Sequence, residues 1–390
     1  MLTMQQDTTD ISPPPRKRRR LSSSPKIGAE AAPPPPSQRN AARQHASDTA
    51  LSSLRIYSWN INGINPFLPP PTSQITSFFT PTIPLSKPLS LAAPAAPPSL
   101  RAYLRRWNWP HILCLQEVKI APTDTKTQAA IRRAINAPLE QEDEEDGKRC
   151  LYDAHFELPK DKHNATGFGG KVYGVCTLVR RDVSDTKVLS VDWDLEGRVL
   201  LVEIPSLGVV VINVYAVNGT TNDYRDSQTG KVVGDRHDRK RVFHTLLARD
   251  VKRYERSGWE VIVAGDINIS RTKIDSFPHL RMGEEHVKNR ADFEERIIGG
   301  LGMIDTFRFK RGEERKYSCR PRNKPWGAGG DRVDMILVTQ SSRERVKEAD
   351  ILDCKEERGP SDHVPLFVEL EVAGREEIID NEDGDQRPPW

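Results

Sequence analysis

Short runs of apolar residues follow one another along this chain, and most of them end at a polar residue. The runs are mostly continuous rather than alternating, which indicates strands buried on both faces. The first, LRIYSWN, alternates as a half-buried strand would. We predict strands over residues 54–60, 112–116, 173–180, 198–204, 209–217, 261–265, 333–339 and 364–372.

Helical patterns are fewer, and three segments carry them. Ser99 would cap a helix over residues 99–109, a longer helix would run from Asp238 to about Ser257, and a third would end at Gly299. The apolar face of the long helix is predicted to consist of Val242, Leu246, Val251 and Tyr254. Many strands with few helices favour an α/β protein, a four-layered sandwich of two packed mixed β-sheets flanked by helices, over a barrel.

Composition divides the chain into a folded part and two tails. Residues 1–51 are rich in proline and polar residues, and residues 373–390 are acidic, so both are predicted to be disordered. The folded domain would span 52–372, with low-complexity inserts at about 66–98 and 139–148. The basic cluster RKRRR at 16–20 is typical of a sequence read by a nuclear import receptor, which predicts a nuclear protein; a loosely bound basic tail is the alternative.

Charge and cysteine content limit the function classes without choosing one. The net charge of +3 does not by itself indicate a nucleic-acid-binding protein. Five widely spaced cysteines without a CxxC pair argue against a disulfide scaffold and a zinc site, and favour a reducing compartment. No apolar run approaches the roughly 18 residues of a membrane span, so no membrane partner is expected.

The polar residues at the strand ends are the candidate chemistry. They are Asn60 and Asn62, Gln116 and Glu117, Tyr215 and Asn218, Asp266 and Asn268, and Ser361, Asp362 and His363, with Asp334 inside an apolar run. Each alone is more typical of a turn or a core position. Together they form an oxygen-rich set with one histidine, which suits Mg²⁺, with Mn²⁺ possible, and the hydrolysis of phosphate esters.

Nine of these segments also resemble, in order, a known family. They are WNING (59–63), LQEVK (115–119), YGV (173–175), EGRVL (196–200), NVYAVN (213–218), GDINIS (265–270), IDTFR (304–308), DRVD (331–334) and PSDHVP (360–365). This order is similar to that of the exonuclease III and apurinic/apyrimidinic endonuclease family, within the endonuclease/exonuclease/phosphatase superfamily of DNase I-like fold. The resemblance covers nearly all of 54–372.

The resemblance implies roles for the polar residues. Glu117 would be the principal Mg²⁺ ligand, helped by Asn62, with Asp362 at the outer shell of the metal. Asp266 would position or deprotonate the attacking water, with Asn60 and Asn268 as its hydrogen-bonding neighbours. His363, oriented by Asp334, would stabilise the charge that develops on the phosphate.

Other residues would contact DNA. The resemblance places Tyr215 and Asn218 against the substrate phosphate, and Lys119, Arg198 and Arg332 are candidates for further phosphate contacts, although each could equally lie on a solvated face. The implied function is incision of DNA 5′ to abasic sites, trimming of 3′ ends, or both, by a monomer.

The sequence departs from the family pattern at the pocket for the base-free sugar. Cys319 and Asp331 stand where aromatic residues are common, and Trp326 could substitute at a different spacing. These departures keep other substrates open: a 5′-tyrosyl-DNA phosphodiesterase, a poly(A)-degrading nuclease or a small-molecule phosphatase. A non-catalytic binding module is the remaining alternative, although the whole catalytic set is present.

Overall fold

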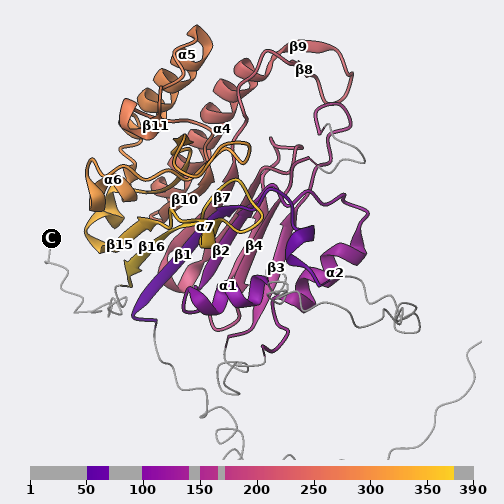
Figure 1. Ribbon diagram of the computed structural model, residues 1–390, viewed down its shortest axis with the longest axis vertical. Coiled ribbons are helices and arrows are strands. Elements are labelled where there is room, and N and C mark those ends of the chain that lie inside the picture. Colours follow the sequence, from indigo (N-terminus) through magenta and orange to yellow (C-terminus); the bar gives the residue numbers. More distant parts are fainter. Residues whose placement is uncertain (1–50, 70–98, 140–149, 166–171, 373–390) are drawn as a thin grey trace, which may run out of the picture. The chain divides into compact units, whose positions relative to one another are not determined.

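A computed structural model describes residues 51–69, 99–139, 150–165 and 172–372, which contain two six-stranded sheets (Figure 1). The first sheet has the order β15–β16–β1–β2–β4–β3. Its strands are β1 (Ser53–Asn60), β2 (Ile112–Gln116), β3 (Tyr152–Glu157), β4 (Val175–Arg180), β15 (Val346–Ile351) and β16 (Leu366–Glu371). β1 and β2 are parallel, and β16 runs antiparallel to β1, so the sheet is mixed.

The second sheet has the order β12–β14–β10–β7–β6–β5. Its strands are β5 (Lys187–Ser190), β6 (Val199–Ile204), β7 (Val209–Tyr215), β10 (Glu260–Asp266), β12 (Ile304–Asp305) and β14 (Asp334–Val338). β7 and β10 are parallel, whereas β14 is antiparallel to β10. Two further strand pairs lie outside these sheets: β8 (Asp223–Arg225) with β9 (Val232–Asp235), and β11 (Ser276–Phe277) with β13 (Gly330–Asp331).

The structure describes six α-helices, four of which pack on the outer faces of the sheets. The six helices are α1 (Leu100–Arg106), α2 (Thr125–Ala134), α4 (Arg236–Arg256), α5 (Glu284–Phe293) with its π-helical continuation Glu294–Gly299, α6 (Thr306–Arg311) and α7 (Lys355–Arg358). α1 and α2 pack on the first sheet, and α4 and α5 on the second, at opposite sides of the strands in Figure 1. A third apolar cluster fills the space between the sheets. The predicted four-layered α/β sandwich is therefore confirmed.

The long helix α4 begins where a capping box closes its first turn, because Asp235 and Asp238 each accept from the other's backbone N–H. Its buried apolar face differs from the predicted one: Val242 is 49% exposed, whereas Phe243, Leu247, Val251 and Tyr254 are buried. The error is a shift of one residue for the first half of the helix. The 3.6-residue period allows two adjacent stripes there, and only contact with β7 and β10 decides between them.

Several segments that the structure shows as regular were not predicted, and among them are β3, β5, β15 and α2. β3, β5, β15 and α2 contain charged or exposed residues, as in the strand KVLS of β5, where no side chain is fully buried. β3, β5 and β15 are edge strands of the two sheets. Edge strands have little apolar signal because one long side faces solvent and is often charged.

The strand directions bring one end of each sheet to a common site. β1 and β2 end together, as do β7 and β10, while β14 and β16 begin at that same end. Gly265 permits the close approach of β10 to β7, since its φ is +155° and an added Cβ would overlap the Val214 carbonyl oxygen.

Some predictions fall outside the described residues. The tail 1–50 with its basic cluster, most of the 66–98 and 139–148 inserts and the acidic tail 373–390 lie there, and their predicted disorder stays a prediction. Within the described ranges, no helix combines the length and apolar character that crossing a bilayer requires.

Candidate active site

Asp266 lies at the centre of the site, at the end of β10 and 1% exposed. Asn60 Nδ2 donates to its Oδ2 at 3.0 Å, and the backbone N–H of Asn268 donates to its Oδ1 at 2.8 Å. Burial and then repulsion from Asp334 raise the pKa of Asp266 to about 7, although His363 and Asn60 act in the opposite direction. A carboxyl with that pKa can accept a proton from water near neutral pH.

His363 and Asp334 form a buried pair beside Asp266. The imidazole Nδ1 lies 2.7 Å from Asp334 Oδ2, and Asp334 faces Asp266 across the antiparallel ladder of β10 and β14. Burial opposes the charged imidazolium, but Asp334 and, after it, Cys319 raise the pKa of His363 well above its ordinary value. The imidazole is therefore held in one orientation and can donate a proton or a hydrogen bond to a phosphate oxygen.

Glu117, Asn62 and Asp362 lie together at the mouth of the site. Asn62 Nδ2 donates to Asp362 Oδ1 at 2.7 Å, and Asn60 Nδ2 donates to Glu117 Oε1 at 2.9 Å. Burial works against the charge of Glu117, but Lys119, with hydrogen bonds from Asn60 and Tyr215, lowers the pKa of its carboxyl. The Tyr215 hydroxyl thereby joins the same network.

The position of the Lys119 ammonium group shows that oxygens of this site can surround a positive charge. Its Nζ lies 3.1 Å from Glu117 Oε2 and also donates to Asn62 Oδ1, so both oxygens converge on one positive charge. The donors are hard oxygens, which Mg²⁺ and Mn²⁺ prefer. Glu117 and Asn62 therefore fit the predicted metal, with Asp362 hydrogen-bonded to Asn62 behind them.

Four residues of this site have left-handed backbone conformations although none is glycine. Asn62, Glu117, Lys119 and Asn268 have φ values of 51°, 50°, 55° and 55°. Such conformations cost free energy and persist where the surrounding structure imposes them, often at functional sites. Here they follow the last residues of β1, β2 and β10, and they turn the side chains back toward one another.

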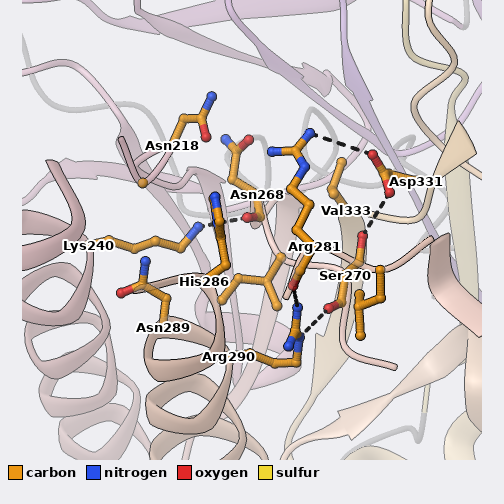
Figure 2. A pocket seen from close by; sticks show the side chains of 13 residues that line it. Asn218, Lys240, Asn268, Ser270, Arg281, His286, Asn289, Arg290, Asp331 and Val333 are labelled. Atoms are coloured by element: carbon orange, nitrogen blue, oxygen red, sulfur yellow. Dashed lines mark hydrogen bonds and ion pairs between the residues drawn. The ribbon is translucent and has the colours of Figure 1, made fainter. Parts of the chain in front are cut away.

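Asn218 is exposed and lines a pocket beside Asn268 (Figure 2). Around this pocket lie Lys240, Arg281, His286 and Arg290, which makes its wall cationic and polar. Figure 2 shows Arg281 directed toward Asp331, with a 3.6 Å ion pair between the two side chains. Burial, and after it repulsion from His237 and from Arg281, Lys240 and Arg290, lowers the pKa of His286.

The two residues that depart from the family pattern have different surroundings. Asp331 lines the pocket in Figure 2 and accepts a 2.7 Å hydrogen bond from Ser276 Oγ. Cys319 lies beside His363. Trp326 does not line this pocket: its ring packs against the Arg320 and Arg358 guanidinium groups, which lie 4.7 and 5.2 Å from its centroid.

The predicted phosphate contact by Arg332 is wrong. Its side chain is fully buried, with Nε 2.6 Å from Asp275 Oδ1 and Nη2 2.9 Å from Asp305 Oδ2. Arg198, also considered for that role, is 1% exposed and ion-paired to Glu196 at 3.0 Å. Both arginines support the site from within, because their donors are already used by buried carboxylates.

Sequence reasoning missed two supporting residues. Lys240 of α4 is 2% exposed and donates to the backbone oxygen of Asn268 at 2.7 Å (Figure 2). Burial lowers the pKa of Lys240 to about 7. Ser318 Oγ accepts from the backbone N–H groups of Val333 and Asp334. The signal for Lys240 is its spacing, since a lysine three residues before Phe243 lies on the buried stripe of the helix.

Comparison with known sequences agrees with this geometry. The model of the endonuclease/exonuclease/phosphatase family matches residues 57–363. A curated relative, DNA-(apurinic or apyrimidinic site) endonuclease 2 of Saccharomyces cerevisiae, is 24% identical over 262 residues, which is 56% of this chain and 47% of the yeast protein. The chain thus spans about half the length of that relative.

Solved structures share the fold. An AP endonuclease from Archaeoglobus fulgidus superposes with a TM-score of 0.53 at 21% identity, over 82% of this chain and all of the other. The catalytic domain of Xenopus laevis APE2 gives 0.53 at 20% identity, over 83% and 94%. AP endonuclease LMAP from Leishmania major gives 0.55 at 16%, over 82% and 88%. At these identities the likeness establishes the fold alone.

Proposed function

This chain belongs to the endonuclease/exonuclease/phosphatase family, and we propose that it is a Mg²⁺-dependent DNA phosphodiesterase of base-excision repair, which incises 5′ to abasic sites, trims 3′ ends, or does both. The expected resemblance to this family is confirmed. One observation carries the proposal: a buried Asp266, held by Asn60 and Asn268, lies beside the His363–Asp334 pair at the mouth where Glu117 and Asn62 converge.

The protein's own residues divide the chemistry between them. Asp266 accepts the proton of the attacking water, since burial and Asp334 favour its protonated form more than in an ordinary carboxyl. Asn60 and Asn268 fix the orientation of that carboxylate. His363 donates to the phosphate oxygen on which charge develops, and Asp334 retains the imidazole in that position.

Glu117 and Asn62, with Asp362 behind them, would hold the metal. When bound, a divalent ion neutralises phosphate charge and polarises the phosphoryl oxygen. Mg²⁺ suits this set because it usually takes one or two carboxylates and completes its shell with water and substrate phosphate. Mn²⁺ would serve the same residues. Lys119, already directed at the same oxygens, would shift toward a substrate phosphate.

The polar pocket favours 3′-end trimming as an activity alongside abasic incision. Asp331 and Arg281 form part of its wall where an aromatic surface would enclose a base-free sugar. Asn218 lines this pocket and, with Tyr215, a neighbouring one, and these two residues would contact the scissile phosphate. A 5′-tyrosyl, poly(A) or small-molecule substrate is the alternative that these same departures support.

The basic cluster near the N-terminus supports a nuclear location. We propose that residues 16–20 bind a nuclear import receptor and that the protein acts in the nucleus as a monomer on damaged duplex DNA. The curated yeast relative, named as an endonuclease for abasic sites, is consistent with a DNA substrate.

The decisive experiment uses the full chain and a duplex with one abasic site, together with the same duplex carrying a recessed 3′ end. Wild type and Asp266→Asn are compared in Mg²⁺ and in EDTA, on denaturing gels. We expect Asp266→Asn to lose at least about 100-fold in rate, since a general base contributes roughly that much or more. EDTA should abolish the wild-type reaction.

Asp192→Asn is the matched control, because its side chain is 95% exposed and lies outside the site. It should cut like wild type. Equal cutting by Asp266→Asn would refute the assignment of the base. Failure of wild type on both DNA substrates, with turnover of a 5′-tyrosyl, poly(A) or small phosphate substrate, would refute the repair function while leaving the site in place.

A further inference from the structure

The Cys319 thiol lies against the catalytic histidine. Its backbone pairs with Asp331 on one side and forms a bridge to His363 on the other. The side chain is half-buried, and its Sγ lies within 4.8 Å of a ring nitrogen of His363. No pattern in the sequence shows this proximity, because Cys319 and His363 are far apart along the chain and no CxxC or His-rich motif surrounds either.

Cys319, Asp362 and His363 together form a three-donor cluster. One sulfur, one carboxylate oxygen and one ring nitrogen lie within 4.8 Å of one another. In a tetrahedral zinc site, bond lengths near 2.0–2.3 Å place ligand atoms about 3.5 Å apart. Side-chain rotations that close the cluster by about 1 Å would meet that geometry, and a half-buried thiol has room for them.

The surroundings of the cluster resemble those of known metal sites. Asp334 occupies Nδ1 of His363 at 2.7 Å, so the other ring nitrogen is the one left for a metal ion. This carboxylate–histidine arrangement is common behind zinc ligands and increases the basicity of the ring. Asn62 similarly orients Asp362 through a 2.7 Å hydrogen bond. Three protein ligands would leave a fourth position open.

The cluster shares Asp362 with the oxygen donors around Glu117 but differs from them in chemistry, because it adds a sulfur and a ring nitrogen. Thiolate and imidazole ligands select Zn²⁺ or Cd²⁺, whereas Mg²⁺ prefers oxygen. Among the cysteines that the structure describes, Cys319 alone belongs to such a group of metal-ligating side chains. Cys114, Cys150 and Cys176 are buried, and Cys354, half-buried like Cys319, is the natural comparison.

We propose that Cys319, Asp362 and His363 form a second metal site, selective for thiophilic divalent ions such as Zn²⁺, and that its occupancy inhibits the enzyme. A bound ion takes the ring nitrogen of His363 that would otherwise donate to the phosphate. The inhibitory part rests on the proposed function; the binding itself does not. Excess Mg²⁺ does not displace the ion, because Mg²⁺ competes poorly for sulfur.

The binding test uses the full, untagged chain, reduced and in excess Mg²⁺. Cd²⁺ is added, and the ultraviolet charge-transfer band of a cadmium–thiolate bond is recorded. Zn²⁺ affinity is measured in parallel by competition with a chromophoric chelator. We expect Cys319→Ser to remove the band and to weaken Zn²⁺ binding at least about 10-fold, whereas the control Cys354→Ser retains both. If Cys319→Ser has a lower melting temperature than wild type, Cys319→Ala replaces it in both measurements.

The inhibition test follows cleavage of the abasic and recessed duplexes in Mg²⁺ while Zn²⁺ is titrated, each variant compared with its own zinc-free rate. Wild type and Cys354→Ser should be half-inhibited at the same Zn²⁺ concentration, and Cys319→Ser should need a concentration at least about 10-fold higher. Unchanged affinity and an unchanged band in both Cys319 variants would overturn the proposal. Zinc binding that needs Cys319, in a protein that cuts neither duplex, would uphold the site and count against the repair function instead.

Discussion

At the scale of single residues, the pairing of Asp266 with Asp334 explains the unusual acid–base character of the site. The two carboxyl groups face each other across β10 and β14, and both are buried. Asp334 Oδ1 has no hydrogen-bond partner among the described residues. Two neighbouring carboxylates cannot both ionise without cost, and this repulsion adds to burial in raising the pKa of Asp266.

This arrangement predicts how stability depends on pH. Asp266 titrates near 4 in an unfolded chain and at about 7 when folded. Between these values the folded state holds a proton that the unfolded state has released, so the free energy of unfolding falls as pH rises. Asp266→Asn should flatten this fall. Urea unfolding in EDTA between about pH 4 and pH 6, below the ordinary imidazole pKa, measures it.

Asp192→Asn is again the comparison, since an exposed carboxyl should leave the wild-type slope unchanged. If Asp266→Asn showed the same slope as wild type over that range, the raised pKa of Asp266 would be wrong. The catalytic role would then need a base whose proton affinity is set in another way, for instance through the metal.

At the scale of elements, Arg332 joins segments that the two main sheets do not connect. It lies just before β14 and pairs with Asp275, in the loop after β10, and with Asp305, whose side chain caps α6. Arg308 and Arg271 also contact these two carboxylates. These ion pairs therefore hold the segment that follows Asn268 in place relative to β14, and with it the spacing of Asp266 and Asp334.

Arg332→Met should accordingly destabilise the fold rather than weaken DNA binding. Removing one partner of a buried ion pair leaves uncompensated charge and costs about 3–5 kcal/mol. Urea denaturation monitored by tryptophan fluorescence gives the value. Arg343→Met is the control. Because Arg343 and Glu344 form an exposed ion pair, this change should alter the free energy of unfolding by no more than about 0.5 kcal/mol. Unchanged stability with weakened duplex binding would restore the predicted phosphate contact.

At the scale of the whole molecule, the described residues that build the site and the four hydrophobic clusters lie between 51 and 372. A chain of 51–372 should therefore fold and cut a short duplex at a rate near that of the full chain. Its melting temperature should also be unchanged. Loss of cooperative unfolding in this truncation would show that a tail completes the domain.

The same truncation should alter the salt dependence of DNA binding. Residues 1–50 carry eight Lys/Arg against four Asp/Glu, so their removal should reduce the slope of log Kd against log salt concentration. DNA binding is measured by fluorescence anisotropy in proteins that also carry Asp266→Asn, so that the DNA is not cut during the measurement. Removal of 373–390 alone is the control and should leave that slope unchanged, because acidic residues release no counterions from DNA.

The sequence alone determined the buried strands and the residues at their ends. A continuous apolar run must be buried, and polar groups that recur at the ends of such runs can gather wherever parallel strands end together. Asn60, Glu117, Asp266 and His363 were found in this way, as was the α/β sandwich. Charged edge strands such as β5 were not, because their burial comes only from pairing.

Tertiary structure alone decided the roles of the charged and sulfur-containing side chains around that centre. From the sequence, Arg332 is a candidate for a surface phosphate contact, but in the structure it is ion-paired with Asp275 and Asp305. Lys240 lies on the face of α4 that packs against the sheet, where it is buried and donates to the backbone oxygen of Asn268. Cys319 acquires a metal-binding partner only when β13 and the start of β16 bring it to His363. The reason is general: desolvation and the choice of partner depend on distance in space, which the order of residues does not contain.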